Sequence, residues 1–204
     1  MPGIKEHPLY IRLRSLKWRL IGWWRHPPWK RAWRSETSKC RRSLERFCIG
    51  NGIDVGFGGD PIAPHALCMD LPQPYARYRR HVQHLHGSAE DLRWFRDDAL
   101  DWLYSSHVLE DFPDTLKVLD EWIRVVRPGG HIILYLPDEQ TYRAYCASKG
   151  KPPNAHHIHE HFGLPMLREL LRGRPGVEII HERFPVGIYS FELVLRKRTP
   201  SKVT

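Results

Sequence analysis

The chain of 204 residues lacks long apolar runs, closely spaced cysteine pairs and internal repeats. Near the amino terminus, the longest uninterrupted apolar run extends from Leu20 to Trp24. A membrane-spanning helix needs about 20 such residues, and the core of a signal peptide about 7–15. None of the four cysteines forms a CxxC pair, which favours free, buried thiols over disulfide bonds. These absences predict a cytoplasmic protein that neither spans a membrane nor depends on disulfides.

Positive charge is concentrated at the amino-terminal end. Residues 1–46 contain thirteen Lys or Arg and three Glu, a net charge of +10, so the formal net charge of +9 leaves −1 for the other residues. Five of the eight tryptophans lie in the same segment. The sequence therefore predicts a basic, tryptophan-rich arm over residues 1–46, a globular domain over 47–198 and a short tail over 199–204. Three partners of the arm stay open: its own domain or a second subunit, an anionic membrane surface, or a nucleic acid backbone.

A glycine-rich loop follows the first predicted strand of the globular part. Ile53 and Val55 are typical of the end of a buried strand, and Gly56, Gly58 and Gly59 follow within four residues. Glycines at the carboxyl end of a strand let the backbone turn sharply and approach a ligand closely, because no Cβ intervenes. The sequence therefore predicts a ligand-binding turn here.

The connection to the next strand is unusually short. Residues 66–69 are apolar and end at Asp70, and only about six residues, two of them proline, separate Asp60 from this strand, whereas an ordinary crossover with a helix needs a dozen or more. We therefore expect the first crossover helix to be lost or reduced to a turn. Asp70 suits two roles, as an acceptor for both hydroxyls of a ribose or as a turn residue ahead of Leu71.

Further elements follow in a regular order. A buried strand is predicted over residues 99–104, and Asp114 caps a helix that ends at the run Arg-Pro-Gly-Gly of residues 127–130. We expect the remaining elements to be a strand over 131–136, a helix from 163 to about 172, and an antiparallel pair of strands over 177–180 and 191–196 at the sheet edge.

Three motifs in this order resemble class I S-adenosylmethionine-dependent methyltransferases. They are the Asp-x-Gly-x-Gly that begins at Asp54, the Ser-x-His-Val-Leu-Glu that begins at Ser105, and the Pro-Gly-Gly before the strand over 131–136. The second resembles the fourth-strand motif of the type 11 methyltransferase group, and the short connection is similar to a short-crossover subgroup. The resemblance implies an α/β, Rossmann-like three-layer sandwich with a mostly parallel sheet, an antiparallel last strand and a truncated first crossover helix. It also implies S-adenosyl-L-methionine as the cofactor.

The resemblance assigns site residues in three groups. The methionine part of the cofactor would lie against Asp54, Gly56, Gly58 and Gly59; the ribose against Asp70 and Leu71; and the adenine edge against Ser88, Ala89 and Glu90. Ser88 stands where the family often has an aspartate. Ser105 and His107 would face the reactive methyl group.

Histidines supply the candidate catalytic and acceptor-binding groups. An imidazole with a pKa near ~6.5 suits a general base for an oxygen acceptor, so His107 is either that base or a structural imidazole. His156, His157 and His159 are candidates for the acceptor pocket, and the resemblance supports this role. Two alternatives are a cation shared by His157, His159 and His161 in an extended segment, and a solvated loop. We expect the pocket and no metal.

The sequence thus predicts a methyltransferase that acts on a small-molecule or saccharide-type acceptor, with the arm in peripheral contact with a membrane. Two alternatives belong to other classes. One is a nucleic-acid methyltransferase that uses the arm on phosphates, and the other is a catalytically inert binding protein that kept the fold.

Overall fold

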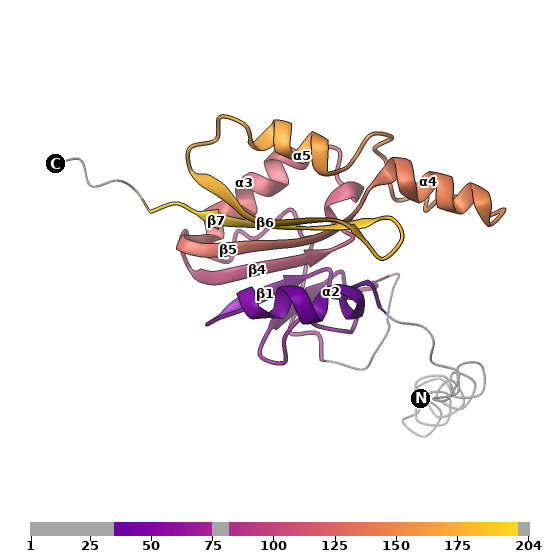
Figure 1. The fold of residues 1–204 in the computed structure, drawn as a ribbon. Helices are drawn as coiled ribbons and strands as arrows, with labels where there is room; N and C mark the ends of the chain where they lie inside the picture. Colours follow the sequence, from indigo (N-terminus) through magenta and orange to yellow (C-terminus); the bar gives the residue numbers. More distant parts are fainter. Residues whose placement is uncertain (1–34, 75–81, 200–204) are drawn as a thin grey trace, which may run out of the picture. The chain divides into compact units, whose positions relative to one another are not determined.

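The computed structural model describes residues 35–74 and 82–199 of the chain (Figure 1). Most of the predicted amino-terminal arm and the last five residues lie outside the described residues. The arm's membrane, nucleic acid or protein contacts therefore stay predictions.

The described residues form a seven-stranded sheet with the order β3-β2-β1-β4-β5-β7-β6 (Figure 1). Strands β1 to β5 pair in parallel, and β7 pairs antiparallel with both β5 and β6. The predicted mostly parallel sheet with an antiparallel end is confirmed. The chain places β2 and β3 on one side of β1, and β4 and β5 on the other, so the strand order reverses between β1 and β4. The strands are β1 (Gly52–Val55), β2 (Leu67–Asp70), β3 (Leu85–His86), β4 (Leu100–Ser106), β5 (Val126–Pro137), β6 (Val177–Val186) and β7 (Ser190–Lys197).

Helices cover the two faces of the sheet unequally. Helices α3 (Thr115–Val125) and α5 (Leu164–Leu171) lie on one face and α2 (Glu36–Leu44) lies on the other, while α4 (Glu139–Ser148) follows β5 (Figure 1). Short 3₁₀ turns occupy Glu45–Phe47 and Leu109–Asp111. Only turns and bends connect β1 to β2, which confirms the predicted loss of the first crossover helix.

Two apolar cores result from the alternation of side chains along the strands. On β4, Trp102 and Tyr104 pack with Cys40 and Leu44 of α2, whereas Leu103 belongs to the core on the opposite face. Successive strand residues point to opposite faces of a sheet, so a strand buried on both sides is apolar at almost every position. This explains why the run over residues 99–104 is apolar at every position except Asp101.

Helix α2 packs on the sheet although its residues lie within the range assigned to the arm. The compact unit that contains the sheet begins at Ser35. The Ser35 hydroxyl caps the helix by accepting from the Ser38 backbone N–H at 3.0 Å, and Arg41 forms an ion pair of 2.9 Å with Asp60. The ion pair joins α2 to the glycine-rich loop, since Asp60 ends that loop.

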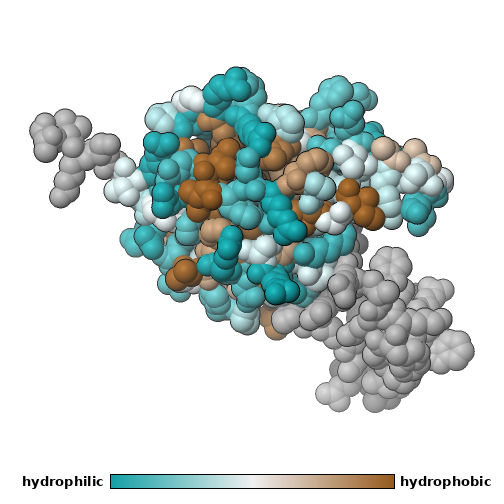
Figure 2. All heavy atoms as spheres, viewed as in Figure 1, coloured by the Kyte–Doolittle hydropathy of each residue, from teal (hydrophilic) through white to brown (hydrophobic). Residues whose placement is uncertain are grey.

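The surface of the described residues offers no membrane-crossing segment. In residues 35–74 and 82–199, no helix has both the length and the apolar character that a bilayer crossing requires. On the face seen in Figure 2, hydrophobic residues lie in separate groups among hydrophilic ones. Scattered exposed apolar residues are normal for a folded protein surface, so their distribution on this face does not indicate a docking site.

Candidate functional site

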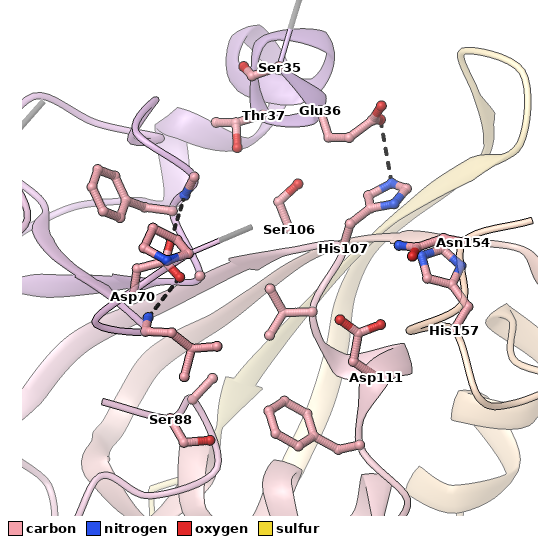
Figure 3. A pocket seen from close by; sticks show the side chains of 18 of the residues that line it. Ser35, Glu36, Thr37, Asp70, Ser88, Ser106, His107, Asp111, Asn154 and His157 are labelled. Carbon is pink, nitrogen blue, oxygen red and sulfur yellow. Dashed lines mark hydrogen bonds and ion pairs between the residues drawn. The ribbon is translucent and has the colours of Figure 1, made fainter. Parts of the chain in front are cut away.

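A cleft of about 380 Å³ opens at the carboxyl ends of β1, β2 and β4, next to the point where the strand order reverses. Ligands of open α/β sheets bind at this position, and the volume is in the range that small-molecule sites occupy. Figure 3 shows Asp70 and Ser88 on one side of the cleft, the start of α2 above it, and His107 and His157 on the other side.

Glycines form the tight turn at the end of β1. Gly56, Gly58 and Gly59 have φ angles of 68°, 58° and 83°, a region that residues with a Cβ rarely adopt. A Cβ on Gly56 would lie 2.3 Å from Cγ2 of Val108, which follows β4. Gly56 and Gly58 line the cleft, whereas Gly59 supports the turn without lining it. The loop therefore needs glycine for its conformation and, at Gly56, for its packing.

The carboxylate of Asp70 fixes the glycine loop against the end of β2. Its Oδ2 accepts a hydrogen bond of 3.0 Å from the Gly58 backbone N–H, and its Oδ1 accepts one of 2.8 Å from the Leu71 N–H (Figure 3). Asp70 and Leu71 both line the cleft. Each carboxylate oxygen can accept more than one hydrogen bond, so the side chain can hold the loop and still accept from ligand hydroxyls.

The third predicted cofactor segment borders the same side of the cleft. Ser88 and Ala89 line it and Glu90 does not; Glu90 is exposed, and the Ser88 hydroxyl donates to it over 3.5 Å. Trp122 of α3 donates its indole N–H to the Ala89 carbonyl at 2.7 Å, and its side chain is fully buried. This bond ties the loop after β3 to the core.

Replacing Trp122 by phenylalanine is expected to lower the free energy of unfolding by about 1–3 kcal/mol, because the buried Ala89 carbonyl loses its donor. Chemical denaturation monitored by circular dichroism measures the change. The matched control is Trp94→Phe, at an indole that is 57% exposed. Equal losses from the two substitutions would contradict the anchoring role of Trp122.

Asp54 and Ser105 lie behind the cleft wall. Asp54 is fully buried, its Oδ2 accepts from the Ile62 N–H at 2.8 Å, and burial raises the pKa of its carboxyl well above the usual range. Ser105 is also fully buried, and the next residue, Ser106, lines the cleft instead. Because side chains alternate along β4, only one of two adjacent serines can face the cleft.

His107 stands at the opposite side of the cleft from Asp70 (Figure 3). Its backbone is in the left-handed region with φ of 53°, and its Nε2 lies 3.1 Å from the Ser190 hydroxyl and 3.5 Å from a Glu36 carboxylate oxygen. Burial lowers the pKa of His107 to about 4, while Glu36 opposes this change and His157 adds to it. The imidazole is therefore neutral at neutral pH, with a proton on one nitrogen, which donates, and a lone pair on the other, which accepts.

His157 is the member of the histidine-rich segment that reaches the cleft. It is buried, and its Nδ1 is hydrogen-bonded to the carboxylate of Glu139 at the start of α4. Its Nε2 lies 3.5 Å from Oε1 of Glu110, and Nδ1 of His107 lies 3.6 Å from the same oxygen. Burial raises the pKa of the Glu110 carboxyl well above its usual range. The two histidines and Glu110 thus meet at one point.

The two other candidate acceptor residues do not line the cleft. His156 is exposed, and His159 donates from Nε2 to the Phe112 carbonyl at 2.7 Å. Within residues 35–74 and 82–199, His157, His159 and His161 do not form a group that could share a cation. Their alternation along an extended segment was the basis of that alternative, and residues 155–156 and 160–161 form turns instead.

Several cleft residues carried no prediction. Two of them, Tyr142 and Tyr189, form an aromatic wall together with the predicted His157, with ring centroids 5.0 Å apart for the two tyrosines and 4.9 Å apart for Tyr142 and His157. One sequence signal points toward Tyr142. Asp138 is a capping residue, and it marks the start of the helix that carries Tyr142, directly after the carboxyl end of β5. The others are Ser35, Glu36, Thr37, Phe57, Pro74, Gly87, Ser106, Val108, Asp111, Phe112 and Asn154.

Comparison with known sequences gives a partial match. Residues 54–134 match the family model described as methyltransferase domain, type 11. A demethylmenaquinone methyltransferase of Bacillus cereus (strain ATCC 10987 / NRS 248) is 41% identical over 127 residues, which cover 54% of this chain and 53% of that protein. The protein of the same name from Lysinibacillus sphaericus (strain C3-41) is 39% identical over 61 residues, covering 30% of this chain and 24% of that protein. The chain thus spans about half the length, or less, of these curated relatives.

Solved structures share the fold at low sequence identity. A protein from Pyrococcus horikoshii OT3 superimposes with a TM-score of 0.62 at 15% identity, covering 90% of this chain and 99% of that one. An S-adenosylmethionine-dependent methyltransferase from Mesorhizobium loti gives 0.54 at 13% identity, covering 80% of this chain and 98% of that one. These similarities concern the fold, and the family match concerns the segment from the glycine loop to β5. Residues 54–134 therefore match the type 11 methyltransferase domain family by sequence, and the solved structures show that the described residues share the α/β fold of their neighbours.

Proposed function

We propose that this chain transfers the methyl group of S-adenosylmethionine to a small molecule that carries a ring, either aromatic or saccharide. The observation that carries the proposal is the division of the cleft: the glycine loop and Asp70 form one side, and the aromatic, histidine-bearing wall forms the other. A cofactor and an acceptor must lie end to end for the transfer, and this cleft offers a distinct surface for each.

On the cofactor side, Asp70 would accept the ribose hydroxyls. The backbone of Gly56 and Gly58 would lie against the methionine part, and Leu71, Ser88 and Ala89 would lie beside the nucleoside. Asp54, Gly59, Glu90 and Ser105 would act indirectly, by holding this wall. The cofactor carries a positive sulfonium, and carboxylates of Glu36 and Asp111 line the same cleft. Negative groups around a cationic ligand raise its local concentration and support its binding.

Methyl transfer from a sulfonium requires mainly alignment of the acceptor and exclusion of water, because the cofactor is already activated. His107 would border the transferred methyl group, with an unprotonated imidazole held by Ser190 and Glu36. A pKa near 4 makes this imidazole a weaker base than a free histidine. We therefore propose His107 as a catalytic residue on the acceptor side rather than as a strong base.

The aromatic wall supports a ring-shaped acceptor. Tyr142, Tyr189 and His157 present faces and edges that can contact a planar ring or the apolar face of a sugar. The curated relatives are named for methylation of demethylmenaquinone, a quinone, which is a small ring compound. A lipid-soluble ring would also agree with the proposed contact between the amino-terminal arm and a membrane.

The proposal is tested with the full chain, methyl-tritiated S-adenosylmethionine and three acceptor sets: hydroquinones and catechols, saccharides, and RNA. We expect label in a ring compound of one of the first two sets, with S-adenosylhomocysteine formed in equal amount. Label in RNA alone would overturn the small-molecule acceptor. Cofactor binding without transfer of label to any of the three acceptor sets would favour the inert binding protein.

A further inference from the structure

Three side chains that can each donate an electron pair converge beside the aromatic wall. They are His107, Glu110 and His157, and their ligand atoms all lie within 4.8 Å of one another. Nδ1 of His107 and Nε2 of His157 lie 3.6 Å and 3.5 Å from the same oxygen, Oε1 of Glu110. In the described part of the chain, no other group of three histidine, cysteine or acidic side chains meets in this way.

The hydrogen bonds around the two imidazoles fix which nitrogen faces Glu110 with a lone pair. Nδ1 of His157 is bonded to the Glu139 carboxylate, which only accepts, so the proton is on Nδ1 and the lone pair is on Nε2. Nε2 of His107 faces the Ser190 hydroxyl at 3.1 Å and a Glu36 carboxylate oxygen at 3.5 Å. A proton on that Nε2 serves both contacts and leaves the lone pair on Nδ1.

Glu110 is fully buried, and neither of its oxygens accepts a hydrogen bond from another described residue. A buried carboxylate that accepts from no neighbouring residue is costly, and here the lone pairs of two histidine nitrogens face one of its oxygens. This arrangement is unfavourable unless a proton or a metal cation lies between the three atoms, and a single proton on Glu110 can serve only one of the two lone pairs. A cation bound to all three would satisfy the carboxylate and both lone pairs together.

We propose that His107, Glu110 and His157 bind a divalent transition-metal cation at the acceptor side of the cleft. Bonds of ~2.0–2.1 Å to nitrogen and oxygen in a tetrahedral site place ligand atoms ~3.3 Å apart, close to the two nitrogen-to-oxygen distances here. Two imidazoles and one carboxylate favour Zn²⁺, Mn²⁺ or Fe²⁺ over Mg²⁺ or Ca²⁺. Glu139, itself paired with Arg143 at 3.1 Å, orients His157 as a second carboxylate orients a metal-binding histidine.

The site deepens the proposed methyltransferase function and rests on it for its role. His107 and His157 line the cleft, so a coordination position open to the cleft could take a hydroxyl oxygen of the acceptor. The cation favours the oxyanion, and the hydroxyl proton leaves to water. The oxygen then bonds to the methyl carbon as the carbon–sulfur bond breaks, which leaves S-adenosylhomocysteine.

The site is tested by calorimetry on the full chain, after a chelator has removed any bound metal. Zn²⁺ and Mn²⁺ are titrated in parallel. We expect the parent chain to bind one equivalent of metal. We expect Glu110→Gln, which preserves the shape of the side chain, to weaken metal affinity at least ~100-fold. Glu139→Gln is expected to weaken it ~10–100-fold, as loss of an outer partner does. The matched control, His161→Gln, removes an exposed histidine of the same segment and is expected to leave metal affinity within threefold.

S-adenosylhomocysteine binding is measured on the same samples. We expect Glu110→Gln to keep it within threefold, because Asp70 and the glycine loop lie on the other side of the cleft. The metal site is overturned if neither metal binds the parent chain, or if Glu110→Gln and the parent chain bind metal with equal affinity. If S-adenosylhomocysteine still binds in that case, the proposed methyltransferase function stands; loss of the ligand from the folded parent chain would instead remove the proposed function.

Discussion

Replacing Asp70 by alanine is expected to weaken S-adenosylhomocysteine binding about 100-fold or more. Hydrogen bonds to a charged group each contribute about 1.5–3 kcal/mol, and the ribose would lose two acceptors at once. The substitution also removes the acceptor for the Gly58 and Leu71 backbone N–H groups, so the glycine loop loses its tie to β2. Isothermal titration calorimetry gives the change in affinity directly.

The matched control is Asp91→Ala, which removes an exposed carboxylate that pairs with Arg93 at 2.8 Å and does not line the cleft. We expect this control to bind within threefold of the parent chain. If the Asp70 variant, folded by circular dichroism, also binds within threefold of the parent, Asp70 does not hold the ribose.

Replacing Gly56 by alanine is expected to lower the free energy of unfolding by about 2–5 kcal/mol and to abolish cofactor binding. The left-handed backbone contributes about 1–2 kcal/mol of this loss, and overpacking of the new Cβ against Val108 contributes about 1–3 kcal/mol. The first cause is set by the φ of 68°, and the second by the 2.3 Å separation from Cγ2 of Val108.

Gly150→Ala separates the two causes. Gly150 has a φ of 63°, and a Cβ there would meet no atom within 4 Å, so only the backbone penalty of about 1–2 kcal/mol is expected. Adding Val108→Ala to the Gly56 variant removes the clashing methyl group and should restore part of the stability. Equal losses at Gly56 and Gly150 would show that the loop does not press against Val108.

The glycine loop, the lost crossover helix and the antiparallel end of the sheet could be predicted because each depends on local sequence. Glycine positions, a proline-bearing connection too short for a helix, and alternating apolar strands all act over a few residues. Asp114 is a further example: it caps α3 by accepting from the Lys117 N–H at 2.9 Å, as its position before an amphipathic run predicts.

Helix α2 could not be separated from the predicted arm, because its amino-acid composition resembles that of the arm. Its basic residues continue the charge of the preceding segment, while Cys40 and Leu44, spaced by four, form the stripe that packs on β4. Charge averaged over a segment describes its solvent-exposed side, and a helix with only two buried apolar side chains in nine residues gives little apolar signal.

The cleft residues also divide into those that local sequence predicts and those that depend on distant parts of the chain. Asp70 and the glycines reach the cleft because strand ends place them there, but the choice of Ser106 over Ser105 depends on which face of β4 looks outward. The choice of His157 over His156 and His159 depends on Glu139, eighteen residues earlier, which draws one imidazole inward. Tyr189 enters from the turn between β6 and β7, and no local pattern predicts such a contact.

We propose above all that the side of the cleft formed by the glycine loop and Asp70 holds S-adenosylmethionine. Titration of the full chain with S-adenosylhomocysteine in a calorimeter tests it most directly. We expect saturable heat with one ligand per chain, together with a rise in melting temperature as ligand is added. A folded chain that gives neither heat nor a thermal shift at millimolar ligand would contradict it.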